Sequence, residues 1–369
     1  MASTSRAVQF TPPMRTRGRP RGAASSRERV VSKSSRSQIQ SESTTIDTYN
    51  LEILLSKTLT THHCTPLYRF DATQFHAYAQ DFQEWLKGQL QGIAQAAEEA
   101  VAAIDGEYEK NNEEETGIRK GWKIIDLSFF ELDVEVENDY LADPFGVKIS
   151  CQANSNAKEQ AYYAIFFSAR KNDYPELLKG KASQFSPYPV LLLKAPQWLT
   201  NLISEWFQTK FDCRICKFRL QPFELMEMAE QWAQWQLKDR VRDGNRIPGR
   251  KYLARPLELT YALGDITELK TITLTITLED AKQIYEKVQR LSRRSDQDIT
   301  LIQGVESHFL HHSNIHLSRL SLVRLGTNVA YVASEGKIKL FPVMDVRLTY
   351  LMIDQLLTYN LRQNTSYFS

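Results

Sequence analysis

The sequence has few of the features that mark secreted or membrane proteins. Only four of its 369 residues are cysteine, which is too few for a disulfide framework, so an intracellular, reducing compartment fits best. No apolar run reaches the roughly 18 residues that a membrane span needs. The N-terminus is basic but has no apolar core, which excludes a secretory signal.

Catalytic signatures are also missing. The chain has no glycine-rich phosphate-binding loop, no GxGxxG pattern and no GxSxG pattern. Acidic residues are numerous, but no motif places two of them at one site. Missing motifs lower the odds of an enzyme without excluding one, and our expectation is a protein with no catalytic activity and no cofactor.

The composition is that of a globular protein with a basic N-terminal tail. Hydrophobic residues make up 42% of the chain and charged residues 24%. Residues 1–45 carry nine Arg or Lys and two Glu, a net charge of +7, whereas the whole chain carries +2. This tail is rich in Ser, Arg, Gly and Pro and too poor in apolar residues to form a core, so we expect it to be disordered.

The remaining pattern predicts an α+β protein with two lobes, each a curved, mostly antiparallel sheet with helices on one side. In the N-terminal lobe, strands follow one another without helices between them, which is typical of antiparallel sheets. The predicted organisation is a disordered tail (1–45), an N-terminal lobe (46–237), a basic linker loop (238–255) and a C-terminal lobe (256–369).

Two basic segments are candidate DNA-binding sites. In the tail, the Arg-Gly-Arg-Pro sequence resembles the core of an AT-hook, whose narrow extended backbone lets arginines follow the minor groove. A nonspecific basic tail or a nuclear-import signal is the alternative for this segment. The linker loop is the second candidate, with a solvated linker as its alternative. The candidate residues are Arg15, Arg17, Gly18, Arg19, Pro20 and Arg21 in the tail, and Lys238, Arg240, Arg242, Arg246, Arg250, Lys251 and Arg255 in the loop.

Two clusters have the spacing of metal ligands. His308 and His312 are four residues apart on a predicted helix, close to His311 and His316. Cys213 and Cys216 form a CxxC pattern, but no second CxxC completes a zinc site. We expect packing roles for both clusters and no metal.

Several longer blocks resemble the centromere protein L family. The C-terminal block Ser307–Leu317 (SHFLHHSNIHL) carries most of the resemblance, followed by LVRLGT at 322–327 and EGKIK at 335–339. Two further blocks agree, WFQTKFDC at 206–213 and PLYRF at 66–70. The resemblance covers Pro66 to Phe341 and excludes the tail.

This resemblance implies a non-enzymatic subunit of the inner kinetochore in the nucleus. Family members form a heterodimer with centromere protein N through the C-terminal lobe and contact centromere protein C and other network subunits. The pair attaches the network to the centromeric nucleosome and its DNA. Two alternatives remain: a metal-dependent nucleic-acid enzyme that uses His308 and His312, and a stand-alone AT-hook chromatin protein.

The C-terminal hairpin is the predicted partner interface. Strands at 315–325 and 329–341 would leave an outer edge that can pair with a strand of the partner. The candidate interface residues are Ile315, Leu317, Leu322, Arg324, Val329, Tyr331, Lys337, Ile338 and Lys339.

Overall fold

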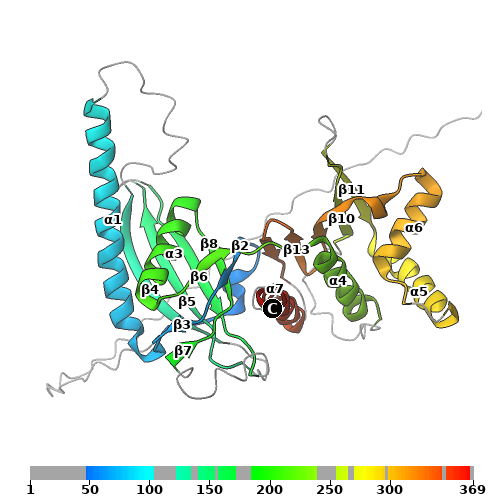
Figure 1. The fold of residues 1–369 in the computed structure, drawn as a ribbon, viewed down its shortest axis with the longest axis horizontal. Coiled ribbons are helices and arrows are strands. Elements are labelled where there is room, and N and C mark those ends of the chain that lie inside the picture. Colours follow the sequence, from blue (N-terminus) through cyan, green and yellow to red (C-terminus); the bar gives the residue numbers. More distant parts are fainter. Residues whose placement is uncertain are drawn as a thin grey trace, which may run out of the picture. The chain divides into compact units, whose positions relative to one another are not determined.

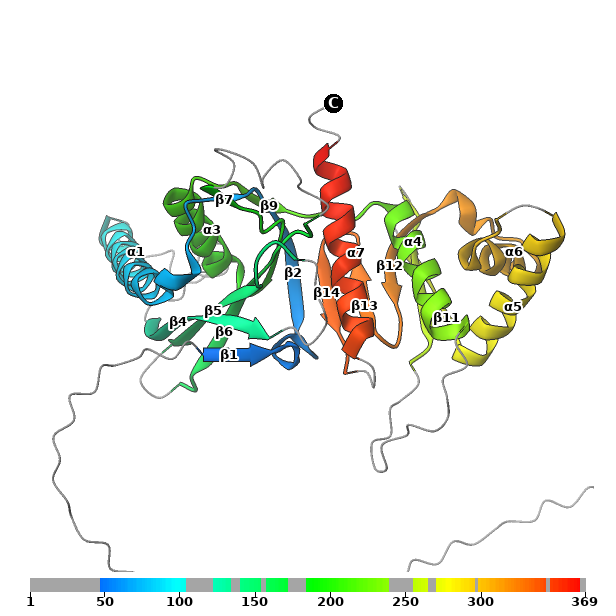
Figure 2. The same cartoon turned by 90° about the horizontal axis from the view of Figure 1, so that it is seen from below.

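A single twelve-stranded sheet runs through the folded chain (Figures 1 and 2). The computed structural model describes residues 47–103, 122–133, 140–153, 157–171, 184–238, 255–264, 270–295, 298–342 and 346–365. Residues Thr45–Ser369 form one unit by their internal contacts, and Met1–Thr44 form another, which lies outside the described residues.

The strands of this sheet are antiparallel except for the first pair, which is parallel. In sheet order they are β1 (Asp47–Asn50), β4 (Lys123–Asp133), β5 (Phe145–Gln152), β6 (Gln160–Phe167), β8 (Val190–Lys194), β2 (Thr58–Cys64), β14 (Lys337–Leu340), β13 (Ala330–Ala333), β12 (Ser321–Gly326), β10 (Leu257–Ala262) and β11 (Thr271–Ile276). β9 (Ile215–Lys217) also pairs with β2, and β3 (Leu67–Tyr68) pairs with β7 (Phe185–Ser186) in a separate small sheet.

Helices pack on both faces of this sheet. The long helices are α1 (Phe75–Ala103), α3 (Gln197–Phe211), α4 (Pro222–Ala233), α5 (Leu278–Ser295), α6 (Leu301–Ser313) and α7 (Val346–Thr365). Short helical turns are η1 (Leu51–Leu54), η2 (Ala72–Gln74), the π-helical η4 (Gln234–Lys238) and η6 (Leu317–Arg319). Helix ends follow local sequence signals: the Thr300 hydroxyl accepts from Gln303 N–H, and the Gln303 side chain accepts from Thr300 N–H, a capping box that starts α6.

The sequence prediction of an α+β fold is confirmed, but the two predicted lobes share one sheet. β14 pairs with β2, so that Ile338 lies opposite Leu59 and Lys337 lies opposite Thr60. The predicted strand at 315–325 begins only at Ser321, because Asn314 ends α6 in a left-handed conformation and η6 occupies the next residues. The two halves of the chain are therefore joined by a backbone ladder.

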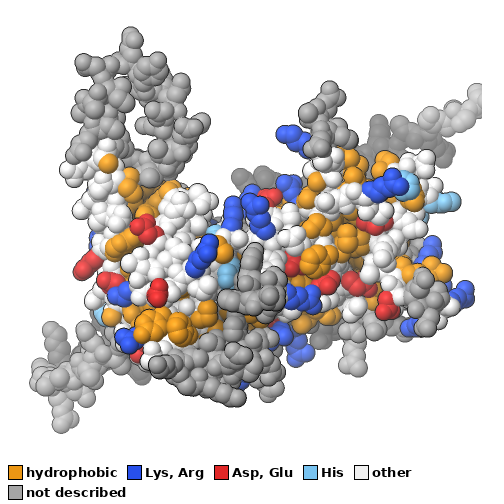
Figure 3. Space-filling model, viewed as in Figure 1, with side chains coloured by type: hydrophobic (Ala, Val, Ile, Leu, Met, Phe, Trp, Pro, Cys, Tyr) orange, Lys and Arg blue, Asp and Glu red, His pale blue; other side chains and the backbone are white. Residues whose placement is uncertain are grey.

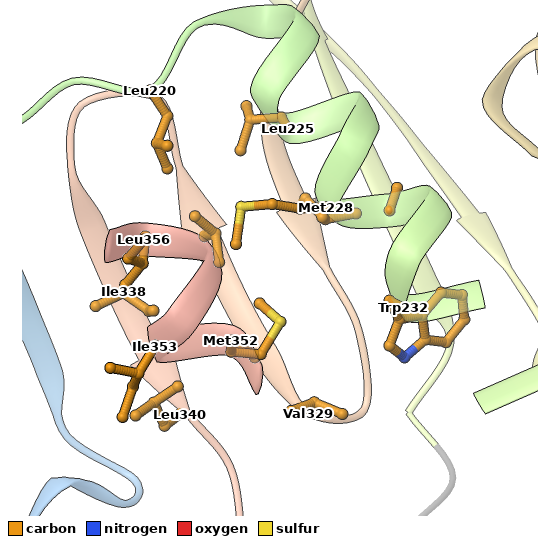
Figure 4. Packing of buried hydrophobic residues seen from close by; sticks show 14 of the residues in the cluster. Leu220, Leu225, Met228, Trp232, Val329, Ile338, Leu340, Met352, Ile353 and Leu356 are labelled. Atoms are coloured by element: carbon orange, nitrogen blue, oxygen red, sulfur yellow. The ribbon is translucent and has the colours of Figure 1, made fainter. Parts of the chain in front are cut away.

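Two hydrophobic cores lie on opposite faces of the sheet. One joins α1 and α3 to the N-terminal strands through aromatic contacts such as Phe82 with Trp206, whose ring centroids are 4.4 Å apart. The other joins both halves: Leu59 and Leu192 share it with Ile338 of β14 and with residues of α4 and α7 (Figure 4).

Helix α7 holds the two halves together with polar contacts as well. Asp354 pairs with Arg170 and accepts a hydrogen bond of 2.9 Å from the Tyr140 hydroxyl, and both partners come from the N-terminal half. Asn360 contacts Nδ1 of His63 on β2 at 2.8 Å. The C-terminal helix is thus packed between segments that are distant in the sequence.

Truncation of Ile338 tests this junction. Because Ile338 is buried at the ladder between β2 and β14, Ile338→Ala is expected to lower the free energy of unfolding by about 3 kcal/mol, measured by urea denaturation. The loss should shift one transition that covers both halves. Lys337→Ala, exposed on the same strand, is the control. Two separate transitions, with only one of them shifted, would contradict a shared sheet.

Acidification should destabilise the same region. Burial lowers the pKa of His62 and of His63, with a smaller contribution from the nearby charges of Lys217 and Arg214. As pH falls below about 6.5, the unfolded chain therefore binds protons that the folded chain does not, and stability decreases. Urea midpoints measured on both sides of this pH should differ less in a His62→Gln/His63→Gln variant. An unchanged difference would exclude these histidines as the cause.

Candidate partner and nucleic-acid interfaces

β11 ends the sheet, and no described strand pairs with its outer edge. It runs antiparallel to β10, with Ile276 opposite Leu257 and Thr271 opposite Ala262. A strand edge with unpaired backbone groups is a template for another strand. β11 is therefore the first candidate for partner docking.

The hydrogen-bond phase of β11 shows which of its backbone groups face outward. Leu263 N–H donates to the Lys270 carbonyl at 3.0 Å, so this pair is a hydrogen-bonded pair of the ladder. Because such pairs alternate with non-bonded ones, Ile272, Leu274 and Ile276 bond to β10. The N–H and C=O groups of Thr271, Thr273 and Thr275 then point to the open edge.

The side chains of β11 also suit the addition of a strand. Ile272, Leu274 and Ile276 are half-buried on one face, and the three threonines are exposed on the other. The aliphatic side chains pack against the core only in part, so a further strand would cover more of their surface.

Two other open strand edges, on β1 and on the first half of β4, are less suited to docking a partner strand. β1, at the opposite end of the sheet, has only four residues. The first half of β4 lies beyond its pairing with β1, but it carries Lys123 and Asp126 on exposed positions. Short strands and charged side chains both disfavour edge pairing.

The prediction that the C-terminal hairpin has a free edge is wrong. β14 pairs with β2 on one side of the hairpin, and β12 pairs with β10 on the other, so both edges are occupied within the chain. Sequence patterns show which strands form, but not which distant strand completes a sheet.

The predicted interface residues fall into two groups, one exposed or half-buried and one buried in the core. Ile315 is 41% exposed, Arg324 and Lys337 are exposed, and Tyr331 and Lys339 are half-buried. The other four are in the core, at 1% exposure or less: Leu317, Leu322, Val329 and Ile338. Whether the exposed residues contact a partner stays a prediction.

A cationic group surrounds the tip of this hairpin. The Lys337 ammonium donates to Glu335 Oε1 at 2.9 Å and lowers the pKa of that carboxyl group, and the charges of Arg324 and Lys217 lower it further. Three cations from β14, β12 and β9 thus lie around one carboxylate. Lys and Arg side chains gather near the middle of the view, above the position of β2 and β13 (Figure 3).

This cationic group points away from the core beneath α7. Ile338 and Leu340 pack toward Ile353 and Leu356 of that helix (Figure 4). Lys337 and Lys339 alternate with them on β14 and so face the other way. The arrangement presents positive charge on one face of the sheet, as the binding of phosphates requires.

Most of the predicted DNA-binding residues lie outside the described residues. These are Arg15, Arg17, Gly18, Arg19, Pro20 and Arg21 of the tail, and Arg240, Arg242, Arg246, Arg250 and Lys251 of the loop. Lys238 ends η4. Arg255 is exposed, and its guanidinium carbon lies 3.7 Å from the centroid of the Phe341 ring, one residue beyond β14. The described end of the basic loop therefore lies close to Lys339.

The two metal-like clusters differ in environment. The rings of His308 and His312 are 4.5 Å apart on exposed positions of α6. Cys213 is buried, and Cys216 is exposed on β9 opposite His63. Within the described ranges, no three His, Cys, Asp or Glu side chains are arranged to hold a metal ion. None of the described helices combines the length and apolar character of a membrane span.

Comparison with known proteins identifies the family. The model of the centromere protein L family matches residues 53–363. Centromere protein L of Gallus gallus is 25% identical over 301 residues, covering 79% of this chain and 76% of the relative. The Mus musculus protein is 26% identical, with 82% of each chain covered, and the Homo sapiens protein is 24% identical, with 82% of this chain and 78% of the relative covered. The chain therefore belongs to the centromere protein L family, a family of centromere and kinetochore proteins.

Proposed function

We propose that this chain is a non-enzymatic structural subunit of the inner kinetochore that forms a heterodimer with centromere protein N. The outward row of N–H and C=O groups on β11 carries this proposal, because it is an edge that a partner strand can extend. The partner would thereby continue a sheet that already spans both halves of the chain.

The adaptor role extends to chromatin. We propose that the heterodimer links the centromeric nucleosome to centromere protein C and other inner-kinetochore subunits during chromosome segregation in the nucleus. The cations around Glu335 support a contact with DNA, since several of them lie on one face of the sheet. The AT-hook-like tail and the basic loop are further proposed contacts.

Substitution of Thr273 tests the edge. Thr273→Pro removes an N–H that points outward and leaves the ladder to β10 intact, so it should weaken copurification with centromere protein N at least tenfold. Thr273→Val is the matched control, because it also loses the side-chain contact with Thr260 but keeps the N–H. A folded proline variant that binds as well as the valine variant would exclude this edge.

Charge reversal tests the contact with DNA. Lys217→Glu/Arg324→Glu should weaken the binding of a duplex of about 30 base pairs and reduce the salt dependence of the affinity. Lys123→Glu, at the other end of the sheet, is the control. Fluorescence anisotropy over a series of salt concentrations measures both quantities. Unchanged affinity and salt slope would place DNA elsewhere, and loss of all binding on deletion of residues 1–45 would favour a stand-alone AT-hook protein.

A further inference from the structure

Helix α5 presents a stripe of exposed side chains that the proposed function does not use. Lys287, Arg290, Leu291 and Arg294 are exposed and fall within about 100° of the helix circumference. The helix follows β11 directly and lies at the same end of the molecule (Figures 1 and 2).

The opposite side of α5 is firmly packed. Ala281, Tyr285 and Val288 are at most 3% exposed. Gly304 of α6 lies so close that an added Cβ would come within 2.4 Å of a Val288 methyl group. The exposed stripe is therefore held in place by a rigid pair of helices.

The charge on the second half of α5 is all of one sign. Residues 287–295 contain Lys287, Arg290, Arg293 and Arg294 and no acidic residue. Arg290 lies 3.5 Å from Glu286, but both side chains are more than half exposed, at 68% and 51%, so this pair contributes little to stability. Cations near a helix C-terminus favour the helix dipole, which accounts for the position of Arg293 and Arg294 in the last turn.

Leu291 is not explained by helix stability. It is 52% exposed and lies between cations on the outer face, where its apolar surface contacts water. Phosphate groups gain nothing from such a side chain, whereas a protein segment can cover it. The combination of cations with one exposed aliphatic side chain is complementary to an acidic segment that carries an apolar residue.

We propose that the outer face of α5 binds an acidic segment of a partner protein, with an apolar side chain of that segment packed on Leu291. The carboxylates of the segment pair with Lys287, Arg290 and Arg294. This docking face is separate from the open edge of β11, because it consists of side chains on a helix rather than of backbone groups.

Two fluorescent capped peptides test the proposal with the full chain, one with four acidic residues flanking two leucines and one with serines in place of the leucines. The leucine peptide should bind more tightly in fluorescence anisotropy at about 50 mM salt. Leu291→Ser should weaken the leucine peptide about fivefold, since half of a leucine side chain is left to be buried, and leave the serine peptide unchanged.

The charge variants complete the experiment. Arg290→Glu/Arg294→Glu should weaken both peptides at least tenfold. Lys282→Glu makes the same kind of change on the first half of α5, outside the stripe, and should alter neither by more than twofold. Thermal unfolding followed by circular dichroism confirms that each variant is folded, and Lys287→Glu replaces any variant that is not.

Three outcomes would overturn the proposal. Equal affinity of the wild-type chain for the two peptides would remove the role of Leu291, and so would an unchanged affinity in Leu291→Ser. The third outcome is that neither peptide binds, whereas a DNA duplex binds the wild-type chain and not Arg290→Glu/Arg294→Glu. This result would make α5 a phosphate-binding surface instead.

Discussion

The pairing of β2 with β14 is the constraint on which the rest of the structure depends. It joins backbone segments that are about 280 residues apart, with Leu59 opposite Ile338. Closing so long a loop costs chain entropy, which the buried side chains on both strands and on α7 offset. Because the N-terminal and C-terminal strands lie in one sheet, a change at the junction affects both halves.

The same pairing determines which edges remain for partners. Once β14 is paired with β2 and β12 with β10, the C-terminal hairpin has no open side, and the sheet ends instead at β11. The backbone edge of β11, the cations around Glu335 and the outer face of α5 then lie on different elements. An adaptor that binds several partners at once benefits from such separation, since each contact leaves the others accessible.

The sequence predicted the local elements better than their assembly. Thr alternates with Ile and Leu at 271–276, a pattern typical of a half-buried strand, and the structure has β11 there. Apolar residues at three- and four-residue spacing are typical of a helix, and Met226, Ala229 and Ala233 have this spacing in α4, which begins at Pro222. The position of β11 at the end of the sheet was missed, because partner strands are chosen by contacts between distant residues that leave no local pattern. Its alternating pattern with three exposed threonines was the available signal.

For the candidate sites, too, the sequence predicted individual residues better than the way the fold brings them together. Arg324 and Lys337 were recognised as candidates from their place in the hairpin, but their grouping with Lys217 around one carboxylate depends on the pairing of β9 and β14 with the same strand. Ile338 was chosen as an interface residue because it lies on the hairpin whose outer edge was predicted to pair with a partner strand. It is buried because its strand is internal.

Hydrogen–deuterium exchange of the chain alone and in complex with centromere protein N tests the central claim most directly. The account predicts that binding slows exchange at the amides of Thr271, Thr273 and Thr275, which point outward when the chain is alone, while Ile272 and Leu274, already bonded to β10, change little. A stable complex in which those three amides exchange as fast as in the free chain would contradict it.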